Sequence, residues 1–265
     1  MLRVAGGDAA TFLQGQFSND LGNLKPGEAA YGLWLDRKGH VVADGHVILI
    51  GPGEGYWVAS VSSPAATVAG RLGDFIIADD VALEDQTGGW LGLSLVGEGT
   101  GAWLGSEPRA GIHFKGRRAA AENWEWIHPA EEGGPADAAV ARIREASREE
   151  MERLRIASGI ASVPGDIGPG ELPDEGGLED AAISYSKGCY LGQEVMARLK
   201  SRGSVRRKLV RVRGPGAAPA VPAQLWSGEQ AAGELRSAVG DGDGLGFVGL
   251  ALIRVPPAVE IVGGW

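Results

Sequence analysis

The chain has 265 residues, a net charge of −9 and a single cysteine, Cys189. One cysteine excludes an intramolecular disulfide and any zinc or iron–sulfur site built from several cysteines of this chain. The negative charge argues against a surface that attracts nucleic acid or an anionic membrane as a whole. No run approaches the ~18 apolar residues of a membrane span, and the first residues lack a signal-peptide core. We therefore expect a soluble, cytoplasmic protein without a membrane partner.

Short elements separated by turns characterise the first half of the chain. Glycine occurs 44 times, more than twice its average share of about 7%. Asp8 precedes Phe12 and Leu13 as a capping residue type, which predicts a short helix that ends near Gly15. Extended runs follow at 29–35, 41–50 and 56–61, a helix opens at Pro64, and strands are expected at 81–85 and 90–96. This passage is ferredoxin-like in its order.

The second half predicts one long helix, a loop and a small barrel. Pro135 and Asp137 indicate the start of a helix that runs to about Ser158 and stops at Gly159. Residues 163–177 are rich in proline and glycine, and a loop of this length is more often a functional covering loop than a plain connection. Short β-like runs recur at 209–212, 224–226, 231–239, 246–253 and 258–262. Repeated short strands between turn signals favour a small barrel.

The segment around the cysteine is the first candidate for a chemical centre. It reads Lys187-Gly188-Cys189-Tyr190-Leu191-Gly192-Gln193-Glu194. An ammonium beside a thiol lowers its pKa and favours the reactive thiolate. Tyr190, Gln193 and Glu194 add a ring, an amide and a carboxylate, which suit a planar heterocycle with polar edges. The alternative is that Cys189 is a small buried apolar residue without chemistry.

Two further features carry charge in unusual places. Asp44 lies inside an apolar strand, where a carboxylate needs a partner or a ligand. Downstream of the cysteine, eight cations fall within sixteen residues: Arg198, Lys200, Arg202, Arg206, Arg207, Lys208, Arg211 and Arg213. This run suits nucleic-acid phosphate or a polyanion such as a polyglutamate tail. A solvated strand face is the other interpretation, and the absence of interleaved aromatic residues weakens single-strand nucleic-acid binding.

The cysteine segment, followed by Ala197-Arg198 and Arg202-Gly203, closely resembles the signature of YgfZ-type folate-binding proteins. These are relatives of the aminomethyltransferase (T-protein) of the glycine cleavage system. Segments 12–20, 35–40, 154–160 and 172–178 resemble further landmarks of the superfamily in the same order.

The resemblance implies an α+β fold arranged as a three-part ring around a central hole that holds tetrahydrofolate or a derivative. Its parts would be a discontinuous folate-binding domain (1–47 and 137–203), a ferredoxin-like α/β insertion (48–136) and a C-terminal β-barrel (204–265).

The resemblance also implies roles for individual residues. Cys189 would be a reactive or cluster-contacting thiol beside the hole, Lys187 its activator and Asp44 a catalytic carboxylate. The residues predicted to bind the folate are Tyr31 or Trp34 for stacking, Asp44 and Glu175 for the pterin, Tyr190, Gln193 and Glu194 beside the thiol, and Arg198 or Arg202 for the glutamyl tail. T-proteins carry a pterin-binding Glu where this chain has Ala157, and Glu175 is the candidate substitute. No metal site is expected, because the four histidines show no ligand spacing.

Three functional hypotheses remain open from the sequence. The first is a tetrahydrofolate-binding accessory factor for iron–sulfur cluster assembly or repair. Its partners would be iron–sulfur client or assembly proteins, with tRNA-modifying enzymes among the beneficiaries and without direct binding of tRNA. The second is a folate-dependent aminomethyltransferase-type one-carbon transferase, for which Asp44 is the candidate catalytic acid. The third is a non-catalytic scaffold whose Arg-rich segment grips RNA or a partner protein.

Overall fold

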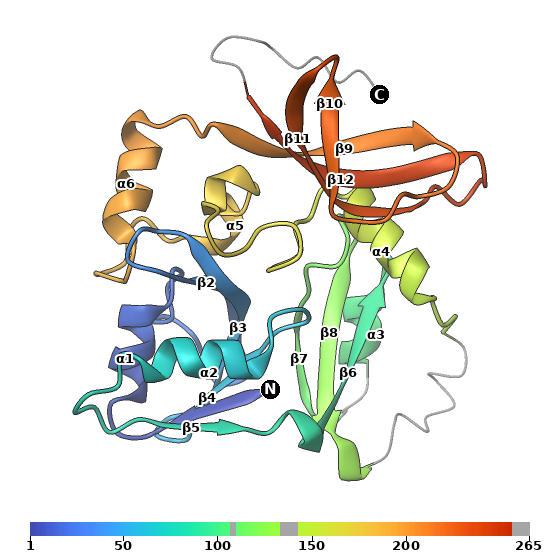
Figure 1. Ribbon diagram of the computed structural model, residues 1–265. Coiled ribbons are helices and arrows are strands. Elements are labelled where there is room, and N and C mark those ends of the chain that lie inside the picture. Colours follow the sequence, from blue (N-terminus) through green and yellow to red (C-terminus); the bar gives the residue numbers. More distant parts are fainter. Residues whose placement is uncertain (107–109, 133–142, 256–265) are drawn as a thin grey trace.

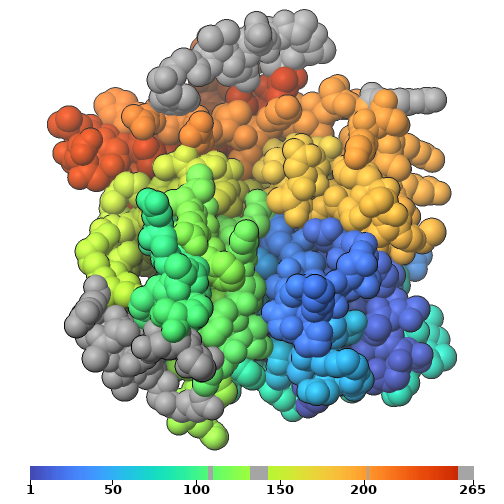
Figure 2. Space-filling view, turned by 180° about the vertical axis from the view of Figure 1, so that it is seen from behind, coloured from blue at the N-terminus to red at the C-terminus, as the bar shows by residue number. Residues whose placement is uncertain are grey.

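Three antiparallel β-sheets with helices packed on them make up the structure, a computed structural model that describes residues 1–106, 110–132 and 143–255 (Figure 1). The predicted mixture of helices and sheets is confirmed. Seen from behind, the N-terminal part (blue), the middle of the chain (green) and the segment that follows it (yellow and orange) lie against one another (Figure 2). Within the described residues, none of the helices is both long and apolar enough to cross a bilayer.

The first sheet has five strands in the order β2-β3-β4-β1-β5. Their bounds are Leu2–Ala5 (β1), Ala29–Leu35 (β2), Val41–Gly51 (β3), Gly55–Ala59 (β4) and Ala82–Asp85 (β5). The turn between β2 and β3 depends on Gly39, whose φ is +78°, and on Asp36, whose carboxylate accepts from the backbone of Lys38 and His40. The strands predicted at 29–35 and 41–50 are thus confirmed.

One face of this sheet is covered by two helices, α1 (Ala9–Gln16) and α2 (Ala65–Gly73). Side chains alternate along a strand, so Ala43 and Val47 of β3 pack into the core beneath the helices, with Phe12 and Leu72. Asp8 lies at the start of α1, but its side chain forms no cap; it accepts instead from the backbone N–H of Asp80. The helices therefore leave the opposite face of β3, with Asp44, free for other contacts.

The opposite face packs partly against a second sheet of order β6-β8-β7. Its strands are Trp90–Val96 (β6), Ile112–Lys115 (β7) and Asn123–Pro129 (β8), with α3 at Thr100–Gly105 and 3₁₀ turns at Thr87–Gly89 and Ala130–Glu132. Ile48 and Ala59 of the first sheet meet Phe114 and Ile127 of the second. The predicted domain boundary at residue 47 lies within β3, and β4 and β5 pair in the first sheet. The division into domains stays a prediction.

The C-terminal part is a four-stranded sheet of order β10-β11-β12-β9, against which α4 packs. The bounds are Arg148–Ala157 (α4), Arg207–Pro215 (β9), Ala223–Ser227 (β10), Gln230–Gly240 (β11) and Gly246–Arg254 (β12). The pairings give an open order with β10 and β9 at the edges, so the closed barrel stays a prediction. The run predicted at 258–262 lies outside the described residues.

The long helix predicted from residue 137 to Ser158 is shorter than expected. Residues 137–142 lie outside the described part, and α4 begins at Arg148. Ser147 sets this start, because its hydroxyl accepts from the N–H of Glu150 while the Glu150 carboxylate accepts from the N–H of Ser147. Gly159, with φ +68°, follows the end of the helix as predicted.

The segment between α4 and β9 fills the remaining space beside β2 and β3. It contains a 3₁₀ turn at Pro173–Glu175 (η4), α5 at Glu179–Ala182 and α6 at Gln193–Arg202. Leu33, Leu35 and Val41 of the first sheet pack against Val163 and Ile167 of this segment. The loop predicted at 163–177 consists of turns and the 3₁₀ turn η4, with Val163 and Ile167 packed into the core, and helix α6 was not predicted.

A buried ion pair joins three of these parts. Arg155 of α4 donates to the Asp166 carboxylate at 2.6 Å, and Asp166 is fully buried. Asp166 also accepts from the N–H of Ser162 at 2.8 Å and from the hydroxyl of Ser237 on β11. Since every partner belongs to a different element, this network fixes α4, the segment after it and the C-terminal sheet relative to one another.

Replacing Asp166 with alanine should lower the free energy of unfolding by about 3–5 kcal/mol, because Arg155 then keeps a buried charge with less compensation. Denaturant unfolding of the purified chain measures this loss. The matched control is Glu149→Ala, which removes an exposed ion pair with Arg153 and should cost less than about 1 kcal/mol. A loss for Asp166→Ala as small as that of the control would contradict the role of the network.

Candidate functional site

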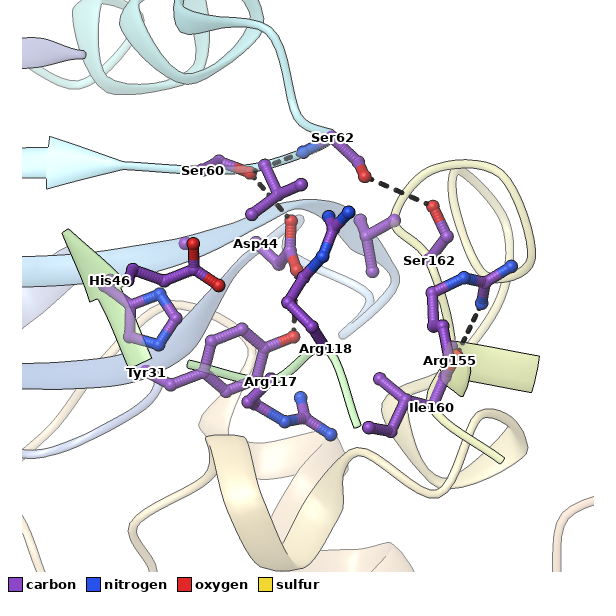
Figure 3. Close-up of a pocket in the computed structure, with 15 residues that line it drawn as sticks. Tyr31, Asp44, His46, Ser60, Ser62, Arg117, Arg118, Arg155, Ile160 and Ser162 are labelled. Carbon is purple, nitrogen blue, oxygen red and sulfur yellow. Dashed lines mark hydrogen bonds between the residues drawn. The ribbon is translucent and has the colours of Figure 1, made fainter. Parts of the chain in front are cut away.

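A pocket lies where the first sheet, the second sheet and the segment after α4 meet (Figure 3). β2 and β3 contribute Tyr31, Asp44 and His46, and the segment after β4 contributes residues 60–62. Arg117 and Arg118, between β7 and β8, and residues 160–163 line the other sides. The pocket encloses about 470 Å³, part of it open to solvent.

Asp44 is the central carboxylate of the pocket. Its Oδ2 accepts from the Tyr31 hydroxyl at 2.9 Å, and its Oδ1 accepts from Ser63 at 2.7 Å and from Ser60 at 3.2 Å. Burial raises the pKa of Asp44 above its usual value, although the three hydroxyl donors partly oppose this effect. Burial and the nearby Asp44 charge raise the pKa of Tyr31 as well, so its hydroxyl is a donor at neutral pH. The Asp44 carboxylate and the Tyr31 hydroxyl thus form a polar wall of the pocket.

His46 and Arg117 form the aromatic and cationic side of the pocket. The His46 ring lies between Tyr31 and Phe114, with centroids 5.2 and 4.6 Å away. Burial, with help from the Arg117 charge, lowers the pKa of His46 to about 3, so the ring is neutral at pH 7. The Arg117 guanidinium lies 4.2 Å from the centroid of the Tyr31 ring. Its charge also favours the ionised form of Asp44.

Lys187 lies beside the end of α1, although the sequence predicted it as the activator of Cys189. Its ammonium donates to the carbonyls of Gln14, Phe17 and Asn19 at 2.7, 2.7 and 2.9 Å. An ammonium has three donors, and all three are used here. Burial lowers the pKa of Lys187 to about 8, with Asp20 opposing the shift. In this structure its hydrogen bonds therefore stabilise the helix end and leave none for the thiol.

Cys189 and its other sequence neighbours lie outside the residues that line the pocket. Cys189 is exposed, whereas Tyr190 is buried in the core with its ring centroid 5.2 Å from the Lys187 ammonium. Gln193 and Glu194 begin α6, which Arg202 ends. Glu194 and Arg198 are largely exposed and approach each other at 3.9 Å. The structure thus separates the cysteine segment from the pocket that contains Tyr31 and Asp44.

The cysteine segment still contacts the hairpin that bears Asp44. Gly192 has a φ of +87°, and a Cβ at this position would lie 3.0 Å from the Asp36 carbonyl and 3.2 Å from the Cα of Gly39. Leu191 donates its N–H to the Gly15 carbonyl at 3.2 Å. Only glycine permits the close approach at residue 192 without displacement of the β2–β3 turn.

Two other residues predicted to contact the folate take part in internal packing or an ion pair. Trp34 is fully buried against Phe17, with ring centroids 4.9 Å apart, and offers no exposed ring face. Glu175 is paired with Arg207, whose Nε and Nη2 donate to the two carboxylate oxygens at 2.9 and 3.0 Å. Arg211 donates to the Ala157 carbonyl at 2.8 Å. Part of the predicted basic run is therefore used for internal contacts.

Of the residues predicted from the sequence, Tyr31 and Asp44 line this pocket together. The polar lining side chains that were not predicted are His46, Ser60, Ser62, Arg117, Arg118, Glu125, Arg155 and Ser162. One signal for the arginines existed: Gly116-Arg117-Arg118 puts two adjacent cations directly after a strand of an acidic chain. Glu125 gave none, because an acid between Trp124 and Trp126 reads as the solvent side of a half-exposed strand. Among the described residues, no three His, Cys, Asp or Glu side chains are arranged to hold a metal ion.

Comparisons with known proteins identify the fold and the family of the chain. A family model for the GCVT N-terminal domain matches residues 1–105. The solved structure of glycine cleavage system aminomethyltransferase T from Bartonella henselae superimposes with a TM-score of 0.77 at 18% identity, covering 98% of this chain and 77% of that protein. The fold is therefore that of the GcvT-like superfamily.

Sequence relatives identify the family within this superfamily. The mitochondrial iron-sulfur cluster assembly factor IBA57 of Mus musculus is 30% identical over 278 residues, which cover 96% of this chain and 75% of the relative. The Homo sapiens protein of the same name is 30% identical over 279 residues, with 96% and 74% covered. The tRNA-modifying protein YgfZ of Vibrio vulnificus is 24% identical over 247 residues, with 91% and 75% covered. The chain belongs to the IBA57/YgfZ-type family of the GcvT-like superfamily.

Replacing Lys187 with methionine should lower the free energy of unfolding by about 3 kcal/mol, because one buried and two part-buried carbonyls lose a charged donor. Denaturant unfolding measures the loss. The rate at which Cys189 reacts with a thiol reagent should stay unchanged under native conditions, since the ammonium is bonded elsewhere.

Lys200→Met is the matched control, because that ammonium lies over the Tyr185 ring at 3.6 Å and bonds no described carbonyl. Its cost should stay near or below about 1 kcal/mol. A stable Lys187→Met protein in which Cys189 reacts much more slowly would restore the activator role.

Proposed function

We propose that this protein binds tetrahydrofolate or a derivative in the pocket around Asp44 and acts as an accessory factor in iron–sulfur cluster assembly or repair. Iron–sulfur enzymes such as tRNA-modifying ones would be its clients. The observation that carries the proposal is a half-buried carboxylate, Asp44, held by hydroxyl donors in a pocket that three cationic side chains also line. The names of the relatives support the second half of the proposal.

The chemistry of the lining fits a reduced folate. A pterin is planar, with polar edges whose donors and acceptors need hydrogen-bond partners when buried. The rings of Tyr31 and His46 supply an aromatic wall, and Asp44 supplies an acceptor for an N–H group. Arg117 supplies a positive charge for the anionic tail of the ligand, a contact that the sequence assigned to Arg198 or Arg202. These are the residues that would hold the cofactor, which supplies one-carbon chemistry when bound.

Cys189 would then act away from the pterin. It is exposed, so a partner protein has access to its sulfur. A thiolate is the ligand that iron–sulfur clusters prefer in proteins. We therefore assign Cys189 to contact with a cluster or a client, and the pocket to the folate.

A one-carbon transferase is the second candidate, and one observation favours it. Burial raises the pKa of Asp44, and a carboxylate with a raised pKa in a ligand pocket is suited to accept and return a proton. Turnover of an aminomethyl donor by the purified protein with tetrahydrofolate, and its loss in Asp44→Asn, would support this function. No turnover by the wild-type chain would remove it and leave the accessory role.

Titration with 5-formyltetrahydrofolate, a chemically stable reduced folate, tests the first half of the proposal. At a concentration 100-fold above Kd, the ligand should stabilise the protein by about 2.7 kcal/mol and raise Tm by about 5 °C or more. Asp44→Asn should weaken binding about tenfold or more, because an acceptor with a full charge becomes a neutral amide. Calorimetry and thermal melting measure the two effects.

The matched control is Asp79→Asn, the same chemical change at an exposed position. It should bind the folate as the wild type does. No heat and no change in Tm for the wild type at millimolar ligand would reject folate binding in this pocket.

Cys189→Ser and Cys189→Ala, expressed in a cell that lacks the native protein, test the second half. Serine keeps the size and polarity of cysteine but not its thiolate chemistry. Both variants should fail to restore the activity of iron–sulfur enzymes, while both purified proteins bind 5-formyltetrahydrofolate with wild-type affinity. Full restoration by both variants would remove the thiol from the mechanism.

A further inference from the structure

Glu125 of β8 is a buried carboxylate that lines the pocket and retains an unpaired acceptor. The residue is 7% exposed, and its Oε2 accepts from the Ser94 hydroxyl at 2.6 Å. Its Oε1 is buried and has no hydrogen-bond partner within the described part of the chain. A Cβ at Gly116 would lie 2.7 Å from this oxygen, so the absence of a side chain there leaves room for it. A buried carboxylate oxygen without a donor is costly, and such atoms at a pocket wall mark a place for a ligand.

Arg118, which lines the same pocket, has a hydrogen-bond donor without an acceptor. Its Nε is buried and has no acceptor, and its charge favours the ionised form of Glu125 although burial, the larger effect, raises the pKa of that carboxyl. Both residues line the pocket, and neither the Nε of Arg118 nor the Oε1 of Glu125 has a hydrogen-bond partner within the described part of the chain. The second sheet therefore contributes an unsatisfied acceptor and an unsatisfied donor to one lining.

A ligand edge with N–H donors beside a carbonyl oxygen would satisfy both groups. The 2-amino-4-oxo ring of folates has this edge: the 2-amino group and N3–H donate, and the 4-oxo oxygen accepts. Guanine carries the same edge. A carboxylate accepts from two neighbouring N–H groups, and a guanidinium donates to a carbonyl oxygen, so the pair is complementary to this edge in order and in charge.

We propose that Glu125 and Arg118 form the subsite that reads the amino-lactam edge of the pterin, with Glu125 accepting from its N–H groups and Arg118 donating to its 4-oxo oxygen. This inference rests on the proposed function and adds the residues that select the ring. It replaces the sequence expectation for Glu175, whose two carboxylate oxygens are occupied by Arg207. Asp44, on the first sheet, remains available for another part of the ligand.

Calorimetry on the full chain with folic acid and aminopterin tests the subsite, because the two ligands differ at the 4-position only by an oxo or an amino group. Glu125→Gln should weaken folic acid about tenfold or more, since the charged acceptor is lost. Arg118→Met should shift the ratio of the two affinities about tenfold towards aminopterin, because a donor facing the 4-position disappears. Glu84→Gln, the same change as Glu125→Gln at an exposed position of β5, should bind both ligands as the wild type does.

Thermal melting without ligand checks that the variants fold. Glu125→Gln should melt no lower than the wild type, because it removes a buried and incompletely paired charge. Arg118→Met is a second variant on a different segment and provides an independent result if one of them does not fold.

The outcomes separate the two proposals. Wild-type binding of folic acid with unchanged affinities and unchanged ligand ratio in both variants would overturn the subsite and leave the proposed function standing. If the wild type binds guanosine but no folate, the proposed function is rejected. The assignment of Glu125 and Arg118 to an amino-lactam edge would then still hold. No binding of either ligand class would reject both.

Discussion

The ion pair between Arg155 and Asp166 is the interaction on which the arrangement of the pocket depends. Arg155 itself lines the pocket, and Asp166 ends the turn whose first residues, Ser162 and Val163, close one side of the pocket. The pair is buried, so its net contribution to stability is smaller than its geometry suggests. Its main effect is positional: a helix, a loop and a strand meet at one carboxylate, and the pocket wall that they form has one conformation.

The first sheet explains why a polar pocket exists inside an otherwise apolar molecule. β3 gives Ala43 and Val47 to the core under the helices, while Asp44 and His46 point to the opposite face. There the second sheet covers only part of the strand, at Ile48, and leaves the polar positions at the edge of the contact. The carboxylate is consequently desolvated without being sealed, which is the condition that raises its pKa and keeps it accessible to a ligand.

Much of the first sheet could be predicted because its strands alternate, and Asp44 stood out because a carboxylate interrupts an apolar strand. The limits of the prediction have equally specific causes. Helix α4 starts at Arg148 because of the local bond between Ser147 and Glu150, whereas proline and aspartate further upstream suggested an earlier start. Helix α6 is mostly polar, and its apolar face consists only of Val195, Met196 and Leu199, too short a pattern to have been noticed among the cations. Both errors therefore arose from local sequence signals and not from contacts between distant residues.

The site was less accessible to prediction, since the hydrogen bonds of Lys187 go to residues far from it in the sequence. Its partners, the carbonyls of Gln14, Phe17 and Asn19, lie about 170 residues away, and no local pattern announces them. Glu125 was not predicted as a site residue for a related reason. Its strand is covered on both faces, by the Trp103–Trp126 cluster on one side and by the first sheet on the other. Alternation, which distinguishes inside from outside in a half-covered strand, has no such meaning there.

The contact between Gly192 and the β2–β3 turn joins the segment around Cys189 to the hairpin of the first sheet. Backbone atoms of the cysteine segment rest on the same hairpin that carries Tyr31 and Asp44, without an intervening side chain to act as a cushion. A rigid backbone contact transmits small displacements more faithfully than flexible side chains do. A displacement of this hairpin would therefore shift the backbone next to Cys189 as well, so the two regions are not free to move independently.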